Sequence, residues 1–333
     1  MSTTLYFLSK IAIYSLLVLL TTNCMGQTES NNDQKSTQAK VTDTTTYEML
    51  YVFKENDLYG FINRSGKVIV PPTYESTYFF SEGLCQVKKN GKMGFINAKG
   101  EMVIAPRYQY NSMFTEGLAR VSLNDKVGYI DKRGKIVIDF QFEYAWIFSE
   151  GLAEVQLKKK GLYGYIDREG EVVIQPRYSY SHPFSEGLAL VEIDEKYGFI
   201  NRQGEEVIPM RYKSGASFSE GLAVVSVGEG EEPEEWEAFY IDKQGKEVFE
   251  QRFRNAGSFH NGRAAVRIND KWGYINKQGE LVIDAIYYNA WFFDHGLAQV
   301  TFDGDNWAYI DTEGNYVFKE KGFEEAEKKA LQD

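Results

Sequence analysis

Hydrophobic and polar positions follow a pattern that recurs about every 34 residues between residues 47 and 319. Its most regular part is a hexapeptide with aromatic and apolar residues around a central glycine. A short polar turn follows each copy, and then an apolar segment such as KVIV at 67–70 or EVVI at 171–174. Short apolar segments between turn signals predict antiparallel β-strands rather than helices. The copies are LYGFIN at 58–63, KMGFIN at 92–97, KVGYID at 126–131, LYGYID at 162–167, KYGFIN at 196–201 and KWGYIN at 271–276, with shorter ones, AFYID at 238–242 and WAYID at 307–311.

Each copy ends in Asn or Asp, and a glycine follows three residues later. Asx at the first turn position and glycine at the fourth are typical of a type I turn closed by a left-handed residue. We therefore expect eight hairpins of one kind. The pairs are Asn63 and Gly66, Asn97 and Gly100, Asp131 and Gly134, Asp167 and Gly170, Asn201 and Gly204, Asp242 and Gly245, Asn276 and Gly279, and Asp311 and Gly314.

A second repeated block precedes all hexapeptides but the first. A phenylalanine stands three residues before a glycine, a valine follows that glycine by four residues, and another aromatic residue precedes it by nine. We expect these positions to form the core. The phenylalanines are Phe80, Phe114, Phe148, Phe184, Phe218, Phe259 and Phe293, and the other aromatics are Tyr74, Tyr108, Phe142, Tyr178, Tyr212, Phe253 and Tyr287.

The two blocks together predict a unit of three antiparallel strands in a meander, joined to the next unit by a link of about a dozen residues. The glycine in the hexapeptide should mark a place where a neighbouring aromatic ring, such as Tyr163, Tyr197 or Trp272, lies against bare backbone. Residues 47–319 then hold eight units, the last incomplete. Residues 320–333 are expected to form a short helical cap with Phe323, Ala326, Ala330 and Leu331 facing inward.

The combination of FSEGLA, KWGYIN, a turn glycine, VI and a link with proline and an aromatic residue resembles the bacterial WG-repeat family, also called KWG repeats. The resemblance covers nearly the whole chain after its first 46 residues. It implies an all-β repeat protein, often exported, with no shared enzymatic activity and no catalytic residues.

Two global architectures fit such a unit. The units stack as an open twisted solenoid, or the array closes into a β-propeller-like ring in which the link acts as an irregular fourth strand. The unit is shorter than the common propeller repeat, and the C-terminal helix suggests an open end, so we expect the solenoid.

The first 26 residues predict a secretory signal peptide, because Lys10 is their only charge and residues 11–20 are almost wholly apolar. Cleavage after Gly26 gives a soluble product, whereas acylation of Cys24 gives a lipoprotein. Residues 27–46 are polar and should form a flexible linker. We expect an exported chain that is periplasmic, extracellular or lipid-anchored at the outer membrane, with no transmembrane span after processing.

Composition narrows the candidate chemistry. The 333 residues include 37 Lys and Arg against 48 Asp and Glu, for a net charge of −11, which argues against nucleic-acid binding. Two cysteines exclude a disulfide scaffold, and no paired Cys and His spacing predicts a metal site. The sequence thus predicts neither a cofactor nor a metal, and no catalytic residue.

Individual polar residues have structural explanations. We expect His182, His260 and His295 to be turn residues and Cys85 to be a small buried hydrophobic residue. A recurring acid beside the second block's glycine should help to close the turn of its own unit. These acids are Glu82, Glu116, Glu150, Glu186 and Glu220.

The one unique polar feature is an insertion with Glu229, Glu231, Glu232, Glu234, Glu235 and Trp236, which is a candidate contact for a protein partner. The link aromatics Tyr78, Tyr110, Trp146, Tyr180, Tyr288 and Trp291 are a second candidate, for a glycan or a peptide, although core packing also explains them. The sequence therefore predicts a non-enzymatic protein-interaction scaffold at the cell envelope. The alternative is a glycan- or cell-wall-binding module.

Overall fold

The computed structural model of the chain describes residues 50–228, 230 and 236–332. They form eight small antiparallel sheets, numbered here in chain order, and one helix. Sheet 1 contains β1 (Tyr51–Glu55), β2 (Leu58–Ile62) and β3 (Val68–Tyr74); sheet 2 contains β4 (Ser76–Ser81), β5 (Leu84–Lys89), β6 (Lys92–Asn97) and β7 (Met102–Tyr108). Sheet 3 contains β8 (Leu118–Leu123), β9 (Lys126–Asp131) and β10 (Ile136–Phe142); sheet 4 contains β11 (Tyr144–Ala145), β12 (Ala153–Gln156), β13 (Tyr163–Ile166) and β14 (Val172–Tyr178).

The second half of the chain repeats this arrangement. Sheet 5 contains β15 (Tyr180–Ser181), β16 (Leu188–Ile193), β17 (Lys196–Asn201) and β18 (Glu206–Tyr212); sheet 6 contains β19 (Ser214–Gly215), β20 (Ala223–Val227) and β21 (Glu237–Ile241). Sheet 7 contains β22 (Asn255–Ala256), β23 (Ala264–Ile268), β24 (Lys271–Ile275) and β25 (Leu281–Tyr287); sheet 8 contains β26 (Asn289–Ala290), β27 (Leu297–Thr301), β28 (Trp307–Asp311) and β29 (Tyr316–Lys319). Helix α2 (Phe323–Ala330) ends the chain. The predicted all-β tandem repeat is confirmed.

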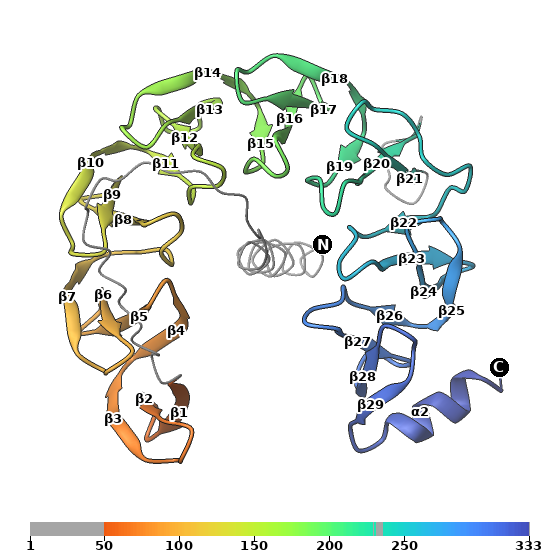
Figure 1. Cartoon of the computed structure of the whole chain (residues 1–333), viewed down its shortest axis with the longest axis horizontal. Helices are drawn as coiled ribbons and strands as arrows, with labels where there is room; N and C mark the ends of the chain where they lie inside the picture. Colours follow the sequence, from red (N-terminus) through yellow and green to blue (C-terminus); the bar gives the residue numbers. More distant parts are fainter. Residues whose placement is uncertain (1–49, 229, 231–235, 333) are drawn as a thin grey trace, which may run out of the picture.

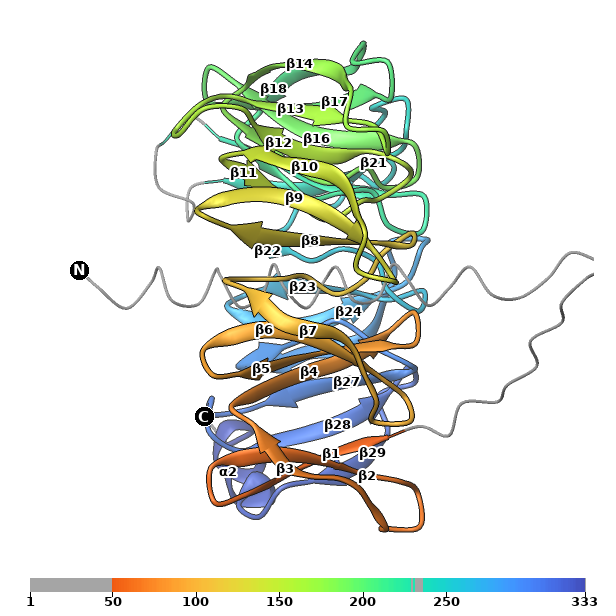
Figure 2. The ribbon, with the colours of Figure 1, turned by 90° about the vertical axis from the view of Figure 1, so that its left-hand side faces the viewer.

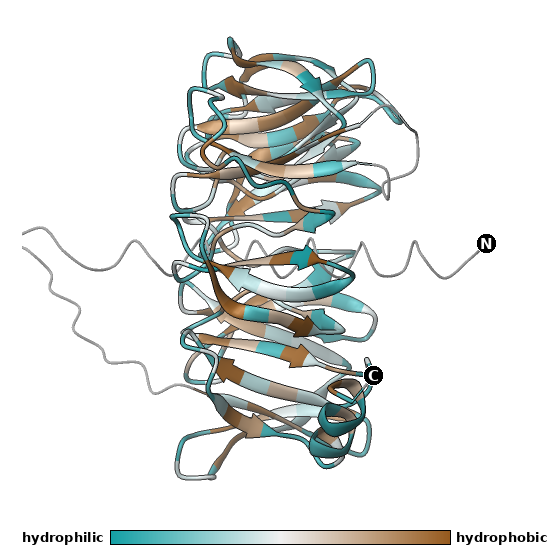
Figure 3. Cartoon of the chain, turned by 90° about the vertical axis from the view of Figure 1, so that its right-hand side faces the viewer, coloured by the Kyte–Doolittle hydropathy of each residue, from teal (hydrophilic) through white to brown (hydrophobic). Residues whose placement is uncertain are grey.

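The eight sheets follow one another around an arc, with an opening between sheet 1 and sheet 8 (Figure 1). The strands lie roughly parallel to one another across the thickness of the arc (Figure 2). Apolar and polar residues alternate along many of them, as expected for sheets that pack face to face (Figure 3). In the part of the chain that the structure describes, no strand pairing joins sheet 1 to sheet 8.

The link is not a plain connection, which corrects the expectation of three strands per unit. Six of the links contain an inner strand, which becomes the first strand of the next sheet. It pairs antiparallel with the second strand of that sheet, as β11 pairs with β12. Pairing satisfies backbone groups that the buried link would otherwise leave unbonded. Sheets 1 and 3 lack an inner strand among the described residues, but in sheet 3 the link still bridges to the sheet, at Asn111 and Val121. Sheet 1 is therefore the one sheet whose described residues include no inner pairing at all, whereas sheet 8 has all four strands.

The eight Asx–Gly hairpins are confirmed. In the first, the N–H of Gly66 donates to the carbonyl of Asn63 at 3.0 Å, and the Asn63 side-chain oxygen accepts from the N–H groups of Ser65 and Lys67. Gly66 has a φ of 80°, which only glycine adopts at little cost.

The glycine of the hexapeptide has a different role from the one expected. A Cβ on Gly94 would lie 2.5 Å from the carbonyl oxygen of Ile104 and 2.7 Å from the nitrogen of Pro106, both in the outer strand β7. The pairing of β6 with β7 shifts beside this glycine, from Met93 with Tyr108 to Phe95 with Ile104. The glycine therefore admits a bulged outer strand, and only at Gly60 is an aromatic ring, that of Phe53, also among the nearest atoms.

Two sheets without this glycine have a different outer strand. Phe239 of sheet 6 and Ala308 of sheet 8 pair with valines in the same way as the glycines of the other sheets. In sheet 6 the outer strand is reduced to isolated bridges, at Phe253 and Glu247, and in sheet 8 Ala308 pairs with Lys319 without a wide bulge.

The core lies between neighbouring sheets. In sheets 1–7, the strand that carries the hexapeptide presents an aromatic ring to the link phenylalanine of the next sheet. For example, Tyr165 contacts Phe184 with ring centroids 4.9 Å apart. The predicted core is confirmed, except that Phe80 is only partly buried. The seven pairs are Phe61 and Phe80, Phe95 and Phe114, Tyr129 and Phe148, Tyr165 and Phe184, Phe199 and Phe218, Tyr240 and Phe259, and Tyr274 and Phe293.

Helix α2 packs through Phe323, which is fully buried against Tyr316 and Phe302. The inward position predicted for Leu331 is wrong, because the helix ends at Ala330 and Leu331 is 59% exposed. The helix also leaves Tyr309 and Phe318 on the free face of sheet 8 exposed. None of the helices in the described part of the chain is long and apolar enough to span a membrane.

Candidate functional site

Polar and aromatic side chains gather along the inner ends of sheets 3, 4 and 5, where β11 and β15 face the centre of the arc (Figure 1). We call this group the inner-edge cluster. Its members are Arg120, Tyr144, Trp146, Glu154, Tyr163, Tyr180, Ser181, His182 and Tyr197.

The rings of the cluster touch in a continuous series across two sheets. Tyr144 contacts Trp146 in the same link, with stacked rings 6.2 Å apart, and meets the edge of Tyr163 at 5.7 Å. Tyr163 meets Tyr180 of sheet 5 at 6.5 Å, and Tyr180 contacts Tyr197 at 6.2 Å. Tyr180 is 42% exposed, so the series reaches the surface there.

Glu154 is buried beneath these rings, with 4% of its surface exposed. Its carboxyl group accepts a hydrogen bond from the Ser181 hydroxyl of the next sheet at 3.1 Å. Burial raises the pKa of Glu154 to about 8, because the charged form loses its hydration and the single hydroxyl compensates only in part. Near neutral pH the carboxyl group therefore holds its proton.

Arg120 and His182 lie on either side of Glu154 along the arc. The Arg120 guanidinium donates to the Ala145 carbonyl at 2.8 Å and stacks over Trp146, 5.2 Å from the ring centroid. Burial lowers the pKa of His182 to about 4, so that ring is neutral, and its Nδ1 lies 3.2 Å from the Ser217 hydroxyl.

The cluster thus offers ring faces, phenolic hydroxyls and one cation, Arg120, and the acidic side chain of Glu192 lies beside Tyr180 and Tyr197. Stacking and hydrogen bonding are the interactions that such a surface provides. In the described ranges 50–228, 230 and 236–332, no three His, Cys, Asp or Glu side chains come together as metal ligands do.

The inner edge differs from sheet to sheet, unlike the core. One position of the link is occupied in turn by Tyr78, Ser112, Trp146, His182, Ala216, Gly257 and Trp291. The position of the second strand that pairs with the aromatic ring of the hexapeptide also varies. Its residues are Gln86, Arg120, Glu154, Leu190, Val224, Ala265 and Gln299.

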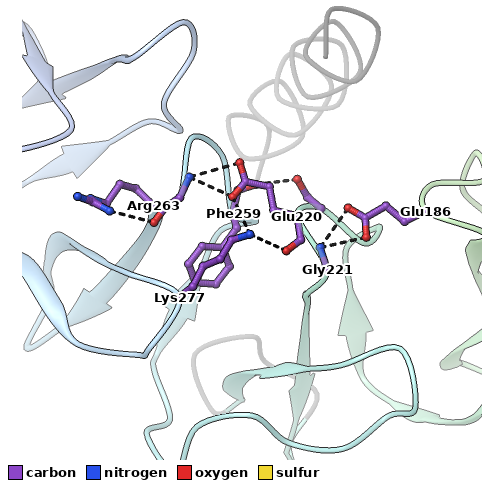
Figure 4. A network of polar contacts seen from close by, with 8 residues as sticks. Glu186, Glu220, Gly221, Phe259, Arg263 and Lys277 are labelled. Carbon is purple, nitrogen blue, oxygen red and sulfur yellow. Dashed lines mark hydrogen bonds and ion pairs between the residues drawn. The ribbon is translucent and has the colours of Figure 1, made fainter. Parts of the chain in front are cut away.

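The recurring glutamates do not close the turn of their own unit, which corrects that expectation. The carboxylate of Glu186 accepts from the N–H of Gly221 in the next sheet at 3.0 and 3.1 Å, and Glu220 accepts in the same way from Gly262 (Figure 4). Lys243 and Lys277 of the next sheet lie 3.2 and 3.3 Å from these carboxylates. The glutamates therefore form a ladder that ties each sheet to the next, and Glu82, Glu116 and Glu150 make the same bond.

The predicted partner contact falls mostly outside the described residues. Glu229, Glu231, Glu232, Glu234 and Glu235 lie there, as does the lipidation candidate Cys24. Trp236 is described, and its indole N–H donates to the Gly230 carbonyl at 3.0 Å with the ring half-buried.

The histidines and the cysteine are placed as follows. Only His295 occupies the turn itself, with a φ of 50°. His260 flanks the turn and is buried against Phe292, and His182 belongs to the link. Cys85 is fully buried, as expected, and burial raises the pKa of its thiol.

The link aromatics divide into two groups. Tyr78, Tyr110, Tyr180 and Tyr288 are exposed, whereas Trp146 and Trp291 are half-buried. Sequence reasoning missed Arg120 and Glu154. The available signal was a charged residue in LARV and LAEV, where the other units have an uncharged one.

The family model for WG-containing repeats matches seven segments, which are residues 59–92, 93–126, 128–160, 163–197, 197–230, 239–272 and 272–304. No curated protein matches the chain at a significant level. The crystal structure of a eukaryotic initiation factor is similar, with a TM-score of 0.57 and 10% identity over 81% of this chain and 85% of that chain. BamB from Moraxella catarrhalis gives 0.42 and 10% identity over 75% and 92%, and Kluyveromyces lactis Hsv2 gives 0.41 and 9% over 83% and 96%. At these identities the likeness concerns the fold alone.

Proposed function

The chain belongs to the WG-containing repeat family, and from that premise we propose that it is a non-enzymatic scaffold that binds another protein at the inner-edge cluster. The residues that recur in each repeat pack the sheets against one another. The side chains that remain for recognition are those of the inner edge.

The observation that carries this proposal is the variation of the inner edge. A glycan of repeating sugars would be matched by equivalent sites, one in each sheet. The inner edge instead presents tryptophan, histidine, serine, alanine and glycine at one position of successive links. A sequence of unlike contacts along one surface suits a folded or extended polypeptide, whose own side chains differ along its length.

The array is proposed to remain open. Tyr309 and Phe318 on sheet 8, and Tyr51 on sheet 1, are exposed on the two end faces, and His295 replaces the glutamate that would bond to a following sheet. These features support an arc rather than a closed ring.

The proposed place of action is the cell envelope, which rests on the apolar N-terminal segment of the sequence. Acylation at Cys24 and cleavage after Gly26 remain the two alternatives for its processing. Detection of a fatty-acyl group by mass spectrometry of the processed chain distinguishes them.

The test is capture from an envelope extract of the native organism, with sedimentation on purified cell-wall glycan in parallel. The proposal expects one stoichiometric protein partner whose capture is lost in Tyr180→Asp and kept in Val207→Asp, a matched change on an exposed outer strand. Glycan sedimentation with no protein partner, or equal capture by both variants, contradicts it.

A glycan-binding module is the second candidate, favoured by two exposed tyrosines at equivalent link positions, Tyr110 and Tyr180. Exposed rings stack on sugars, and two such sites would bind weakly and multivalently. If Tyr110→Ala and Tyr180→Ala each lower glycan binding in part and together abolish it, this candidate replaces the scaffold.

A further inference from the structure

Within residues 50–228, 230 and 236–332, the inner edge of strand β1 has no strand partner. The strand pairs with β2 along its other edge. In sheet 4 the equivalent second strand, β12, uses the carbonyls of Glu154 and Gln156 to accept from the N–H groups of Trp146 and Glu143 in the link. By register Val52 and Lys54 correspond to Glu154 and Gln156, because each pair faces the same positions of the third strand.

The side chains of this region are exposed where their counterparts are buried. Tyr51 and Val52 are 44% and 45% exposed, whereas the corresponding Cys85 and Gln86 in sheet 2 are 0% and 5% exposed. Tyr78 and Phe79, on the inner strand β4 of sheet 2, are also exposed. An unpaired strand edge beside exposed apolar side chains is the usual site of strand addition.

Half of the sheets have an outer edge that is less suited to strand addition. Four of the outer strands carry proline, which has no N–H to donate and hinders an added strand. These prolines are Pro71 and Pro72 in β3, Pro106 in β7, Pro176 in β14 and Pro209 in β18. Strand β1 has none.

We propose that the free edge of β1 binds an extended segment of a partner protein, which adds antiparallel to β1 as the missing inner strand of sheet 1. The proposal deepens the scaffold function by naming the form of the partner. It uses a different sheet from the inner-edge cluster, so either site can fail without the other.

The chain's own links indicate which segment fits. Each link places a small or short polar residue opposite the valine of the second strand, with phenylalanine three residues later. The residues at this position are Thr77, Asn111, Ala145, Ser181, Gly215, Ala256 and Ala290. In sheet 1 the residue opposite is Phe53 in place of valine, so the segment should carry Gly, Ala or Ser there.

The experiment uses a fluorescent peptide with the sequence of residues 142–149, FEYAWIFS, and the full-length chain. Fluorescence anisotropy should show saturable binding that is absent for a scrambled peptide and for one N-methylated at the amide equivalent to Trp146. Val52→Asp should weaken binding at least about tenfold, because an added strand would cover the new charge. Val103→Asp, on the exposed face of outer strand β7, is the matched control and should bind as the unchanged chain does.

Hydrogen exchange distinguishes a free edge from one that is already covered. The amides of Val52 and Lys54 should exchange faster than those of Gln86 and Lys88 in the free chain and slow on peptide binding. Protection of all four amides without peptide would mean that the chain covers its own edge, and would overturn the proposal. Equal binding to Val52→Asp and Val103→Asp, or no binding, would also overturn it.

Discussion

Glutamate is an unfavourable residue for a backbone position with positive φ, yet five of the hairpins that follow a link place one there, at φ values of 50° to 55°. The second residue of each turn is glycine, also at positive φ, as a two-residue hairpin of this hand requires. The strain is offset by the hydrogen bond from each carboxylate to the glycine N–H of the next sheet. Asn261 makes the same bond to Gly296 at 2.8 Å with a residue better suited to that conformation.

Glu186 therefore allows a paired substitution. Glu186→Ala keeps the strained backbone and loses the bond to Gly221, so the free energy of unfolding should fall by about 1–2 kcal/mol. Glu186→Asn can restore the bond, as Asn261 does, and should stay within about 0.5 kcal/mol of the unchanged chain. Urea unfolding of the three proteins measures this, and equal loss in both variants would contradict the ladder.

Glu154 gives the array a dependence on pH. Its folded pKa of about 8 lies above the ordinary value of 4.5, so between these two values the folded chain holds a proton that the unfolded chain has released. The free energy of unfolding should then decrease as the pH rises from about 4.5 to about 8.

Glu154→Gln removes this titration and leaves the neighbouring rings in place. The difference in unfolding free energy between variant and unchanged chain should grow in favour of the variant as the pH rises from 5 to 8.5. His182, whose pKa is lowered, costs stability only as the pH falls below its ordinary value of 6.5, and it is present in both chains. Parallel pH profiles would show that Glu154 ionises normally.

Strands and turns could be predicted from the sequence because their signals are local. Asn63 and Gly66 carry the whole geometry of their hairpin within four residues. The inner strand was predicted only as part of the ring alternative. Its residues carry no common signal, since Tyr144–Ala145 and Ser214–Gly215 occupy the same place with unrelated residues. The partner of Glu186 was also hidden, because a contact to the next unit looks the same in a repeating sequence as a contact within one.

The role of the hexapeptide glycine is understood only from the pairing of two strands. It lets the outer strand bulge toward the third strand, and the outer strand then carries its tyrosine, such as Tyr108, into the core. The sequence marked the glycine as special but gave the wrong neighbour, because the bulge lies on a different strand.

Gly94→Ala should lower the free energy of unfolding by about 1–3 kcal/mol, since the new methyl group meets backbone atoms that cannot move aside. Gly257→Ala is the control, because there the nearest atom to a Cβ is the Ala265 carbonyl at 3.7 Å. Thermal unfolding compares them. If the Gly94 variant were as stable as the Gly257 variant, the bulge of the outer strand would not depend on glycine at this position.

At the scale of the whole molecule, one ring pair is repeated at all seven interfaces between sheets, with centroids 4.8–5.8 Å apart. Sheet 8 breaks the series. Among the described residues, its corresponding ring, Tyr309, meets no link phenylalanine of a further sheet. It contacts Phe318 of its own sheet at 6.4 Å and is 37% exposed. Stability is thus shared between neighbours, as in other repeat proteins, and the end faces contribute little.

An open arc has a consequence for two equivalent tyrosines. Tyr274→Ala removes a fully buried ring and should cost about 3–5 kcal/mol. Tyr309→Ala should cost about 1 kcal/mol or less, because no sheet covers it. If the two substitutions were equally damaging in urea unfolding, sheet 8 would be packed against sheet 1 and the array would be a closed ring.

The central claim is that a partner protein binds at the inner edge, and the most direct measurement is the Kd of the captured partner for point variants of this chain. Tyr180→Ala should weaken binding at least about tenfold, because it removes the exposed ring of the cluster. Val207→Ala, on the outer strand β18, should leave the Kd unchanged. Loss of affinity in Val207→Ala with none in Tyr180→Ala would place recognition on the outside of the arc and contradict the account.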